Sequence, residues 1–320
     1  RQYAIIAVGT VPGTTKVLTL ETIQRLTWAK FALWSANNGA IYFKSGESFN
    51  GPVHSNTELW FSGNPHFFSD CTSAASTIGS GTSSTNTVIF DKGLQLGVNN
   101  GSMADVNLTN MLDKSTLILT GRTTIVLSGT NMLVSNDGRG WTNVVNGVAS
   151  NTVIYVKDDP SGTNYGDLNV SGILDGRLTM VTERDISITN NIRYTCDPKT
   201  NSASDDALGL ISSRDIVVTT NCPANAQIYA HMMATGKASS STNDGSFGVQ
   251  NFNTRAPSGQ LTVHGGIVQQ NRGAVGTFSG STLSSGFDKN YTYDTRFASD
   301  PPPDYPPLLD LLTFQNWRDK

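Results

Sequence analysis

The sequence predicts an all-β protein, a right-handed parallel β-helix (β-solenoid) with an N-terminal β-hairpin and one short helix. Charged residues make up only 15% of the 320 residues, whereas about 25% is typical. The surface must therefore be covered largely by Ser, Thr, Asn and Gly, a mixture that disfavours helices and suits strands joined by turns. Short apolar runs recur along the chain, and one phrase is repeated after thirty residues.

That repeat decides between the β architectures. The phrase "TERDISITNN" begins at Thr182, and "SSRDIVVTTN" begins at Ser212. Strands of an antiparallel sandwich have no reason to recur as copies of a phrase, whereas each turn of a solenoid stacks on a similar turn to bury its inner face. Doubly wound folds fail because no helical patterns separate the strands. The residues assigned structural roles are Arg184, Asp185, Ile186, Ile188, Asn191, Arg214, Asp215, Ile216, Val218 and Asn221.

The solenoid predicts a definite register for these residues. Ile186 should lie beneath Ile216 in parallel register, with both arginines pointing outward, and an antiparallel arrangement would contradict the prediction. Asn at a repeated bend tolerates left-handed backbone and can form hydrogen bonds along the stack.

The elements divide into three predicted segments. Residues 1–39 hold a hairpin that turns at "PGTT" and then a helix over 21–39, "ETIQRLTWAKFALWSANNG", because its apolar residues are dense and Asn-Asn-Gly ends it. Residues 40–300 form the solenoid, with Ser/Thr-rich loops at 69–87 and 236–246. Residues 301–320 form a proline-rich strap that docks Leu308, Leu311 and Trp317 on the body.

Composition limits the functions that the chain can perform. The net charge is −3 and no run of Lys or Arg occurs, so binding of nucleic acid through a broad basic face is disfavoured. Three cysteines are too few for a disulfide scaffold. Cys196 and Cys222 each follow one copy of the repeated phrase, so we consider a disulfide between them, with buried free thiols as the alternative.

The sequence gives little support for a catalytic site or a metal site. Polysaccharide-cleaving β-helices need clustered carboxylates, or a calcium site with a basic group. The Arg-Asp pairs here recur on successive repeats, which favours a stacked surface charge pattern. We therefore expect no catalytic residues, no metal and no cofactor. The carboxylates and arginines considered were Asp175, Glu183, Asp185, Asp205, Asp206, Asp215, Arg177, Arg184 and Arg214, and the scattered histidines were His54, His66, His231 and His264.

Several phrases resemble a known family. "TWAKFALWSANNGAIYFKSGESFNGPVHSN" and "GNPHF" resemble the N-terminal signature of large, β-helical, pilin-like bacterial envelope proteins, catalogued mainly as a domain of unknown function and related to large minor pilins with a β-solenoid. In that family a "SFxxYAxF" helix leads to "GPVHTN" and then "GNPxF". Downstream, "AQIYAHMMATG", "GQLTVHGGIVQQNRGAVGTF" and "DPPPDYPP" are similar to its later coils and closing segment.

The resemblance implies a non-enzymatic structural or adhesive component of an extracellular type IV pilus-like or secretion-like assembly at the bacterial cell surface. Its partners would be other envelope or pilus subunits and surface glycans. Contact with the membrane would come only through an N-terminal helix upstream of Arg1, which we read as a truncated or processed start. The alternatives are a polysaccharide-degrading β-helix enzyme and a DNA-binding pilus-tip module.

Overall fold

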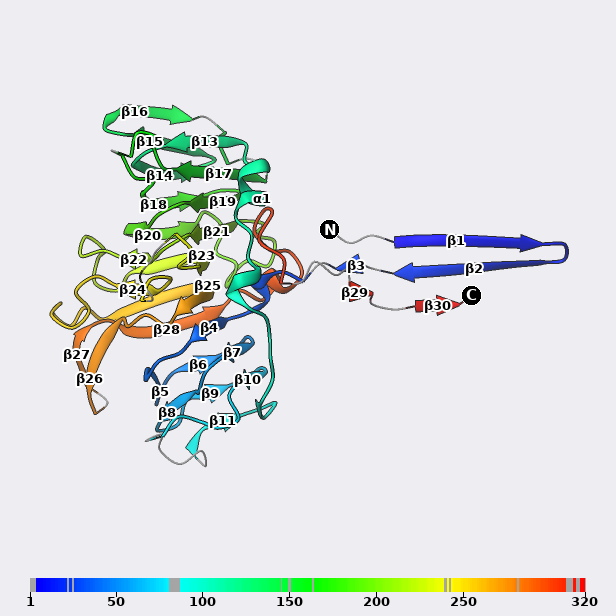
Figure 1. Cartoon of the computed structure of the whole chain (residues 1–320), viewed down its shortest axis with the longest axis horizontal. Coiled ribbons are helices and arrows are strands. Elements are labelled where there is room, and N and C mark those ends of the chain that lie inside the picture. The colour runs from blue at the N-terminus through cyan, green and yellow to red at the C-terminus, as the bar shows by residue number, and fades with distance from the viewer. Residues whose placement is uncertain are drawn as a thin grey trace.

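The computed structural model describes residues 4–21, 23–24, 26–80, 87–144, 146–148, 151–162, 164–238, 241, 243–280, 282–308, 313–314 and 317–319. These residues form an all-β structure with one short α-helix and one large mixed sheet (Figure 1). Within them, no helix is both long and apolar enough to span a bilayer.

Two ladders of parallel strands build most of the large sheet, and adjacent strands in each are joined in parallel register. In spatial order, the first ladder consists of β13 (Leu117–Thr120), β17 (Thr152–Lys157), β19 (Arg177–Thr182), β21 (Ala207–Ser212), β23 (Gln227–Ala234), β25 (Gln260–Asn271), β4 (Leu33–Asn37), β7 (Val53–Ser55), β10 (Cys71–Ser73) and β12 (Leu94–Leu96). The second consists of β14 (Thr123–Gly129), β18 (Leu168–Leu174), β20 (Ile186–Tyr194), β22 (Ile216–Val218) and β24 (Phe247–Val249).

Shorter strands complete the body. Two parallel groups lie beside the N-terminal strands, β28 pairs with the first half of β25, and two antiparallel elements extend the sheet or project from it. They are β5 (Tyr42–Lys44), β6 (Ser48–Phe49), β8 (Trp60–Ser62), β9 (His66–Phe67), β11 (Ile89–Phe90), β15 (Asn131–Asn136), β16 (Arg139–Val144), β26 (Gly276–Ser279), β27 (Thr282–Gly286) and β28 (Asp288–Tyr293).

The order of the strands in space differs from their order in sequence. From β4, at the middle of the stack, the chain runs to the lower end at β12 and then crosses along one side to β13 at the upper end (Figure 1). It then returns repeat by repeat to β25, which pairs with β4. The crossing segment contains the 3₁₀ helix η3 (Met103–Asp105) and the α-helix α1 (Thr109–Asp113). We call the β4–β25 junction the seam.

Both faces of the first ladder are buried from β17 to β10, whereas the end strands β12 and β13 are partly exposed. Leu33, Ile267 and Met232 are paired positions on adjacent strands, and their side chains face an inner core. The next residues along two of these strands, Trp34 and Val268, face an outer core on the opposite side of the sheet. The outer core is covered by the crossing segment and by residues of the C-terminal segment. Strands buried on both faces read as continuous apolar runs.

That double burial explains the wrong prediction of a helix over residues 21–39. The structure has there the strand β3 (Ile23–Gln24), a 3₁₀ turn η1 (Trp28–Lys30) and β4. Because successive residues of β4 enter the inner and outer cores in turn, the segment is apolar on every side and resembles a buried helix in sequence. The α-helix lies instead at α1, for which we predicted no element.

The ends of the chain form an arm that projects from the stack (Figure 1). β1 (Ala4–Val11) and β2 (Thr14–Glu21) pair as the hairpin that the Pro-Gly turn predicts. β30 (Trp317–Asp319) pairs with β2, and β29 (Thr313–Phe314) pairs with β3.

Of the predicted strap residues, Leu308 contacts the body, whereas Trp317 lies in β30 on the arm. Leu308 is buried in the outer core, after the 3₁₀ helix η4 (Thr295–Ala298). Leu311 lies outside the described residues, as do residues 81–86 of the loop predicted over 69–87. The first part of that prediction is wrong, because β10 lies there and pairs with β7 and β12. The division into three segments at 39 and 300 stays a prediction.

Stacked apolar columns should carry much of the stability. Ile216→Ala empties a fully buried position between Ile186 and Phe247, so we expect it to lower the free energy of unfolding by about 2–5 kcal/mol. Ile173→Ala, at a side chain that is 42% exposed, should lower it by under about 0.5 kcal/mol. Urea denaturation of both variants measures the difference, and equal losses would contradict stacked burial.

Candidate functional site

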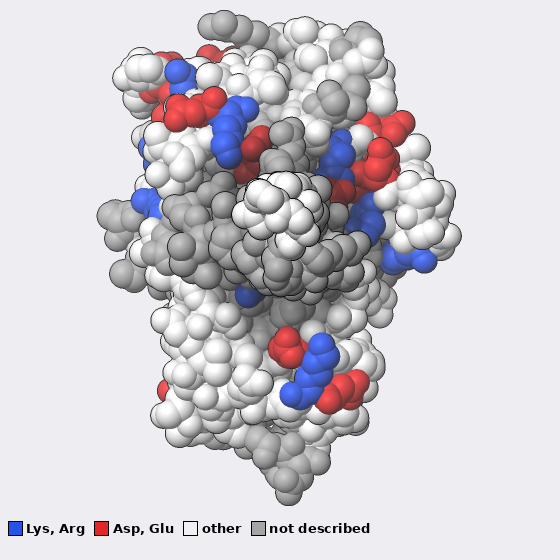
Figure 2. Space-filling model, turned by 90° about the vertical axis from the view of Figure 1, so that its right-hand side faces the viewer, with Lys and Arg blue, Asp and Glu red and all other residues white. Residues whose placement is uncertain are grey.

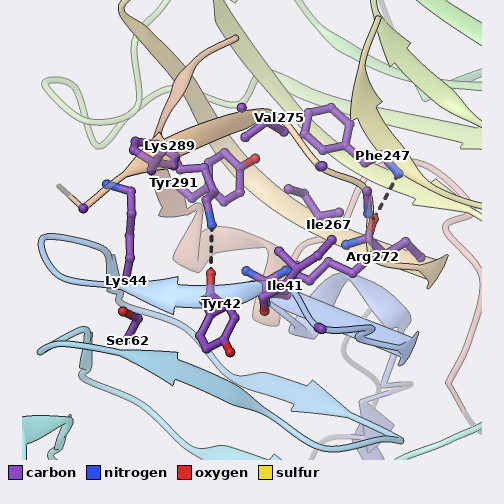
Figure 3. Close-up of a pocket in the computed structure, with 18 residues that line it drawn as sticks. Ile41, Tyr42, Lys44, Ser62, Phe247, Ile267, Arg272, Val275, Lys289 and Tyr291 are labelled. Atoms are coloured by element: carbon purple, nitrogen blue, oxygen red, sulfur yellow. Dashed lines mark hydrogen bonds between the residues drawn. The ribbon is translucent and has the colours of Figure 1, made fainter. Parts of the chain in front are cut away.

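A pocket with a volume of about 380 Å³ lies at the seam. One wall comes from the N-terminal part of the chain, around β5, and the other from the ends of β25 and β28 (Figure 3). Its lining brings together residues from 33 to 62 and from 247 to 291, so neither part of the chain makes the pocket alone. We call it the seam pocket.

Two lysines in the pocket have carboxylate partners. Lys44 Nζ lies 2.9 Å from Asp288 Oδ1, and Lys289 Nζ lies 2.7 Å from Oε1 of the buried Glu47. Lys289 also donates to the backbone carbonyl of Tyr42 at 3.4 Å, as Figure 3 shows. Burial lowers the pKa of Lys289 to about 8, although the adjacent Glu47 carboxylate opposes that shift.

The third cation, Arg272, is held differently. Its Nη1 donates to Asn38 Oδ1 at 2.9 Å and to the carbonyl of Ile41 at 3.0 Å, and the guanidinium stacks 3.8 Å from the centre of the Phe43 ring. Among the described residues no carboxylate lies within ion-pair distance of Arg272. Burial lowers its pKa to about 10, so the group stays cationic at neutral pH.

Apolar and aromatic side chains form most of the remaining surface of the pocket. Phe247, Ile267 and Val275 are each less than 5% exposed, and Tyr291 and Phe278 lie beside them. Gln269 closes this wall, because its Oε1 accepts hydrogen bonds from the backbone N–H groups of Phe247 and Gly273.

Glycine is required in this wall and in the adjoining strand β25. A Cβ on Gly273 would lie 2.0 Å from the carbonyl oxygen of Phe247, and a Cβ on Gly266 would lie 2.3 Å from that of Phe31. Both contacts are far inside van der Waals distance, so only glycine allows the backbones to approach this closely. The phrase "NRGAVG" therefore encodes the geometry of the pocket wall, and the second glycine of "HGGIVQQ" encodes the close approach of β25 to the segment before β4.

The structure places the repeated phrase across two adjacent strands. β20 and β22 pair in parallel, with Ile186 opposite Ile216 and Ile188 opposite Val218. This is the pairing that the thirty-residue repeat predicts, and all four side chains are fully buried.

The arginines of the phrase lie at the surface in ion pairs that join neighbouring repeats. Arg184 Nη2 lies 2.6 Å from Asp158 Oδ2, and the guanidinium packs over the ring of Tyr165. Arg214 Nε lies 3.1 Å from Asp244 Oδ2 and 3.7 Å from Asp185 Oδ1. Their side chains are 25% and 32% exposed.

The aspartates of the phrase form a ladder between repeats. The N–H of Asp215 donates to Asp185 Oδ1 at 3.0 Å, and the N–H groups of Gly245 and Ser246 donate to Asp215 Oδ1 at 2.9 and 2.7 Å. Each carboxylate thus satisfies backbone donors of the repeat beside it. Burial raises the pKa of Asp185, against the opposing effect of its hydrogen bond from Asp215.

The other predicted structural residues behave less regularly. Asn191 Oδ1 accepts the N–H of Gln227 at 2.8 Å, which is a bond to a neighbouring repeat. Asn221 is exposed.

The disulfide considered between Cys196 and Cys222 is not formed: all three cysteines are free. The Sγ of Cys222 is buried and donates instead to the carbonyl of Ile188, and burial raises its pKa to about 11.

Two of the remaining carboxylates considered for an enzyme, Glu183 and Asp206, also bind protein groups. Burial raises the pKa of Asp206, and the nearby Asp175 and Asp205 carboxylates help to raise it. Glu183 accepts from Tyr155 and from the N–H of Asp158. Asp206 accepts the N–H groups of Gly176 and Cys196. Arg177 is paired with Asp300 at 2.7 Å. The described residues contain no cluster of three or more His, Cys, Asp or Glu side chains suited to a metal ion.

The four histidines lie apart from one another. Two of them, His231 and His54, form hydrogen bonds at or near the seam. His231 Nε2 lies 3.0 Å from the carbonyl of Phe31, and its Nδ1 lies 2.7 Å from the hydroxyl of Tyr305. His54 bonds Thr72 and Asn56. His264 lies 3.6 Å from Asp294, and His66 pairs with Asp91 at the surface.

Sequence reasoning missed the seam pocket. Lys44, Arg272 and Lys289 match no motif of a ligand site, and Arg272 bonds Ile41 across 231 positions of sequence. The one local signal is the glycine pattern on either side of Arg272, which indicates a close backbone approach. That pattern alone identifies neither the partner nor a cavity.

The face toward the arm is poor in charge. Figure 2 shows it covered mainly by uncharged residues, with basic and acidic residues mostly near one another and no broad positive patch on this face. This agrees with the low charge content of the sequence.

Comparisons with known proteins give limited matches. The model of a family described as a domain of unknown function, DUF4900, matches residues 9–76, well under half of the chain. A search of the curated proteins finds no match. Among solved structures, the crystal structure of the competence-associated pilin ComZ from Thermus thermophilus is similar at 10% identity and a TM-score of 0.36, covering 100% of this chain and 80% of that one.

The family match has a definite place in the structure. It begins within β1 and ends just after β10, so it covers the turn and second strand of the hairpin, the seam strand β4 and the strands from β5 to β10. It includes the N-terminal wall of the seam pocket, whereas Arg272 and Lys289 lie outside it.

The buried His231 should make stability depend on pH. Burial lowers its pKa to about 4, whereas in the unfolded chain it is about 6.5. The unfolded state therefore binds more protons between these values, so stability is complete above pH 6.5 and falls as the pH drops toward 4. We expect a contribution of up to about 1.4 kcal/mol per pH unit from this group.

Urea unfolding between pH 7 and pH 4.5 measures that dependence. His231→Gln keeps an amide that can donate to the Phe31 carbonyl and removes the titration, so its stability should fall less steeply with pH than that of the wild type. Burial also lowers the pKa of His264 to about 4, and that part of the slope should remain. An unchanged slope in His231→Gln would contradict the assignment.

Proposed function

We propose that the chain is a non-enzymatic structural or adhesive component of an extracellular type IV pilus-like or secretion-like assembly, with a right-handed parallel β-helix as its body. The observation that carries the non-enzymatic part is the aspartate ladder. Asp185 and Asp215 accept backbone N–H groups of the next repeat, and Arg214 lies between Asp185 and Asp244.

Catalysis at a glycosidic bond needs two carboxyl groups that face a shared space and exchange protons with substrate. Here Asp185 and Asp215 stand one above the other along the stack, and each is occupied by the backbone of a neighbouring repeat. Such groups position the turns of a repetitive structure, and this supports a mechanical role better than a catalytic one.

The ladders also support a role in assembly. Among the described residues, β13 pairs only with β17, and β12 pairs only with β10. Each therefore leaves one strand edge without a β partner at an end of the stack. Strand edges of this kind are sites at which another chain can add a strand. We propose that other subunits contact these ends.

The pilus-like part of the proposal rests on the sequence phrases of residues 28–67, which lie within the segment matched by the family model. A surface location follows from the same resemblance. The low charge and the Ser/Thr/Asn-rich exterior suit contact with glycans or other proteins.

Two measurements test the proposal. Incubation with a panel of acidic and neutral polysaccharides should release no reducing ends or unsaturated products above background. Asp215→Asn, which keeps the Oδ1 acceptor, should leave the fold intact and serves as the matched variant. Product release by the wild type that disappears in folded Asp215→Asn would establish the enzyme instead.

Immunogold labelling of the bacteria that produce the protein tests its location. We expect label on the cell surface or on sheared surface filaments. Label confined to the cytoplasm would contradict the envelope role.

A further inference from the structure

The seam pocket has the composition of a ligand site, and this is independent of any pilus-like role. We propose that it binds a small organic monocarboxylate with an aromatic or branched apolar body, whose carboxylate is held by Arg272. Three features of the described residues carry the proposal: the charge balance, the free edge of one guanidinium and the apolar wall.

The charge balance leaves one cation uncompensated. Lys44 lies against Asp288, and Lys289 lies against Glu47, which also attracts Arg272 without forming an ion pair with it, so two carboxylates face three cations and one positive charge is left over. Arg272 is bound by neutral acceptors, the side-chain oxygen of Asn38 and the carbonyl of Ile41. A ligand that restores neutrality therefore carries a single negative charge.

The bonds of Arg272 determine which of its donors remain for a ligand. Both hydrogen bonds leave from Nη1, and the stacking on Phe43 fixes the plane of the guanidinium. Within the described part of the chain, Nε and Nη2 donate to no protein acceptor. Neither nitrogen is fully buried. These two nitrogens form one edge of the guanidinium, which matches the two oxygens of a carboxylate.

The apolar wall determines the rest of the ligand. Phe247, Ile267 and Val275 stand on the side of the pocket opposite Ile41 and Tyr42 (Figure 3). A polar sugar acid would leave its hydroxyl groups without partners against this wall, at a cost in free energy. A volume of about 380 Å³ lies within the range of small-molecule sites, about 300–1,000 Å³.

Isothermal titration calorimetry with 3-phenylpropionate tests the proposal. Its neutral analogue 3-phenylpropionamide has the same body without the charge, so we expect it to bind at least about tenfold more weakly. Glucuronate has the carboxylate without the apolar body and should bind far more weakly than 3-phenylpropionate. Equal affinity for acid and amide would overturn the role of Arg272, and equal affinity for glucuronate would overturn that of the apolar wall.

Variants locate the site. Arg272→Lys keeps the positive charge but loses the two-nitrogen edge, and Arg272→Gln loses the charge as well, so affinity for the acid should fall in that order. Arg193→Gln, at an exposed arginine beside a separate hollow formed with β20, should bind as the wild type does. Unchanged binding in Arg272→Gln would overturn the proposal. If that variant unfolds, the acid–amide comparison in the wild type decides.

Discussion

The parallel pairing of β4 with β25 is the contact on which the rest of the structure depends. It joins Leu33–Asn37 to Ile267–Asn271 and connects the strands that lead to the lower end with those that return from the upper end. The seam pocket exists only because these segments meet. His231, Gly266 and Phe31 show how closely they approach, because the histidine and the glycine both lie against the carbonyl of Phe31.

Burial of the first ladder on both faces is the second constraint. The inner core alone would leave Trp34, Val181 and Ile211 exposed, but the crossing segment and the C-terminal segment enclose them in an outer core. Apolar area buried on both faces supplies most of the driving force for such a fold. Polar side chains are then free to form the exterior and the bonds between repeats, such as the aspartate ladder.

The sequence predicted the parts of the fold that local pattern controls. The hairpin followed from Pro12-Gly13, and the parallel register followed from Ile186 and Ile216, because a repeated phrase stacks on itself. The helix at 21–39 was wrong, since a strand buried on both faces has no alternation to distinguish it from a buried helix. The seam could not be predicted, because β4 and β25 share no phrase. The pocket was missed with it, since Arg272 and Ile41 meet only through that pairing.

Disulfide trapping across the seam tests the account most directly. Asn37 and Asn271 are paired residues of β4 and β25, and Asn37 Nδ2 donates to Asn271 Oδ1 at 3.1 Å. Paired positions on adjacent strands lie within the range of Cα separations, about 4.4–6.8 Å, that a disulfide spans. With Cys71, Cys196 and Cys222 replaced by Ala, Asn37→Cys combined with Asn271→Cys should oxidise rapidly to an intramolecular disulfide, visible as a mobility shift on a non-reducing gel. Two free thiols, or links only between molecules, would contradict the seam.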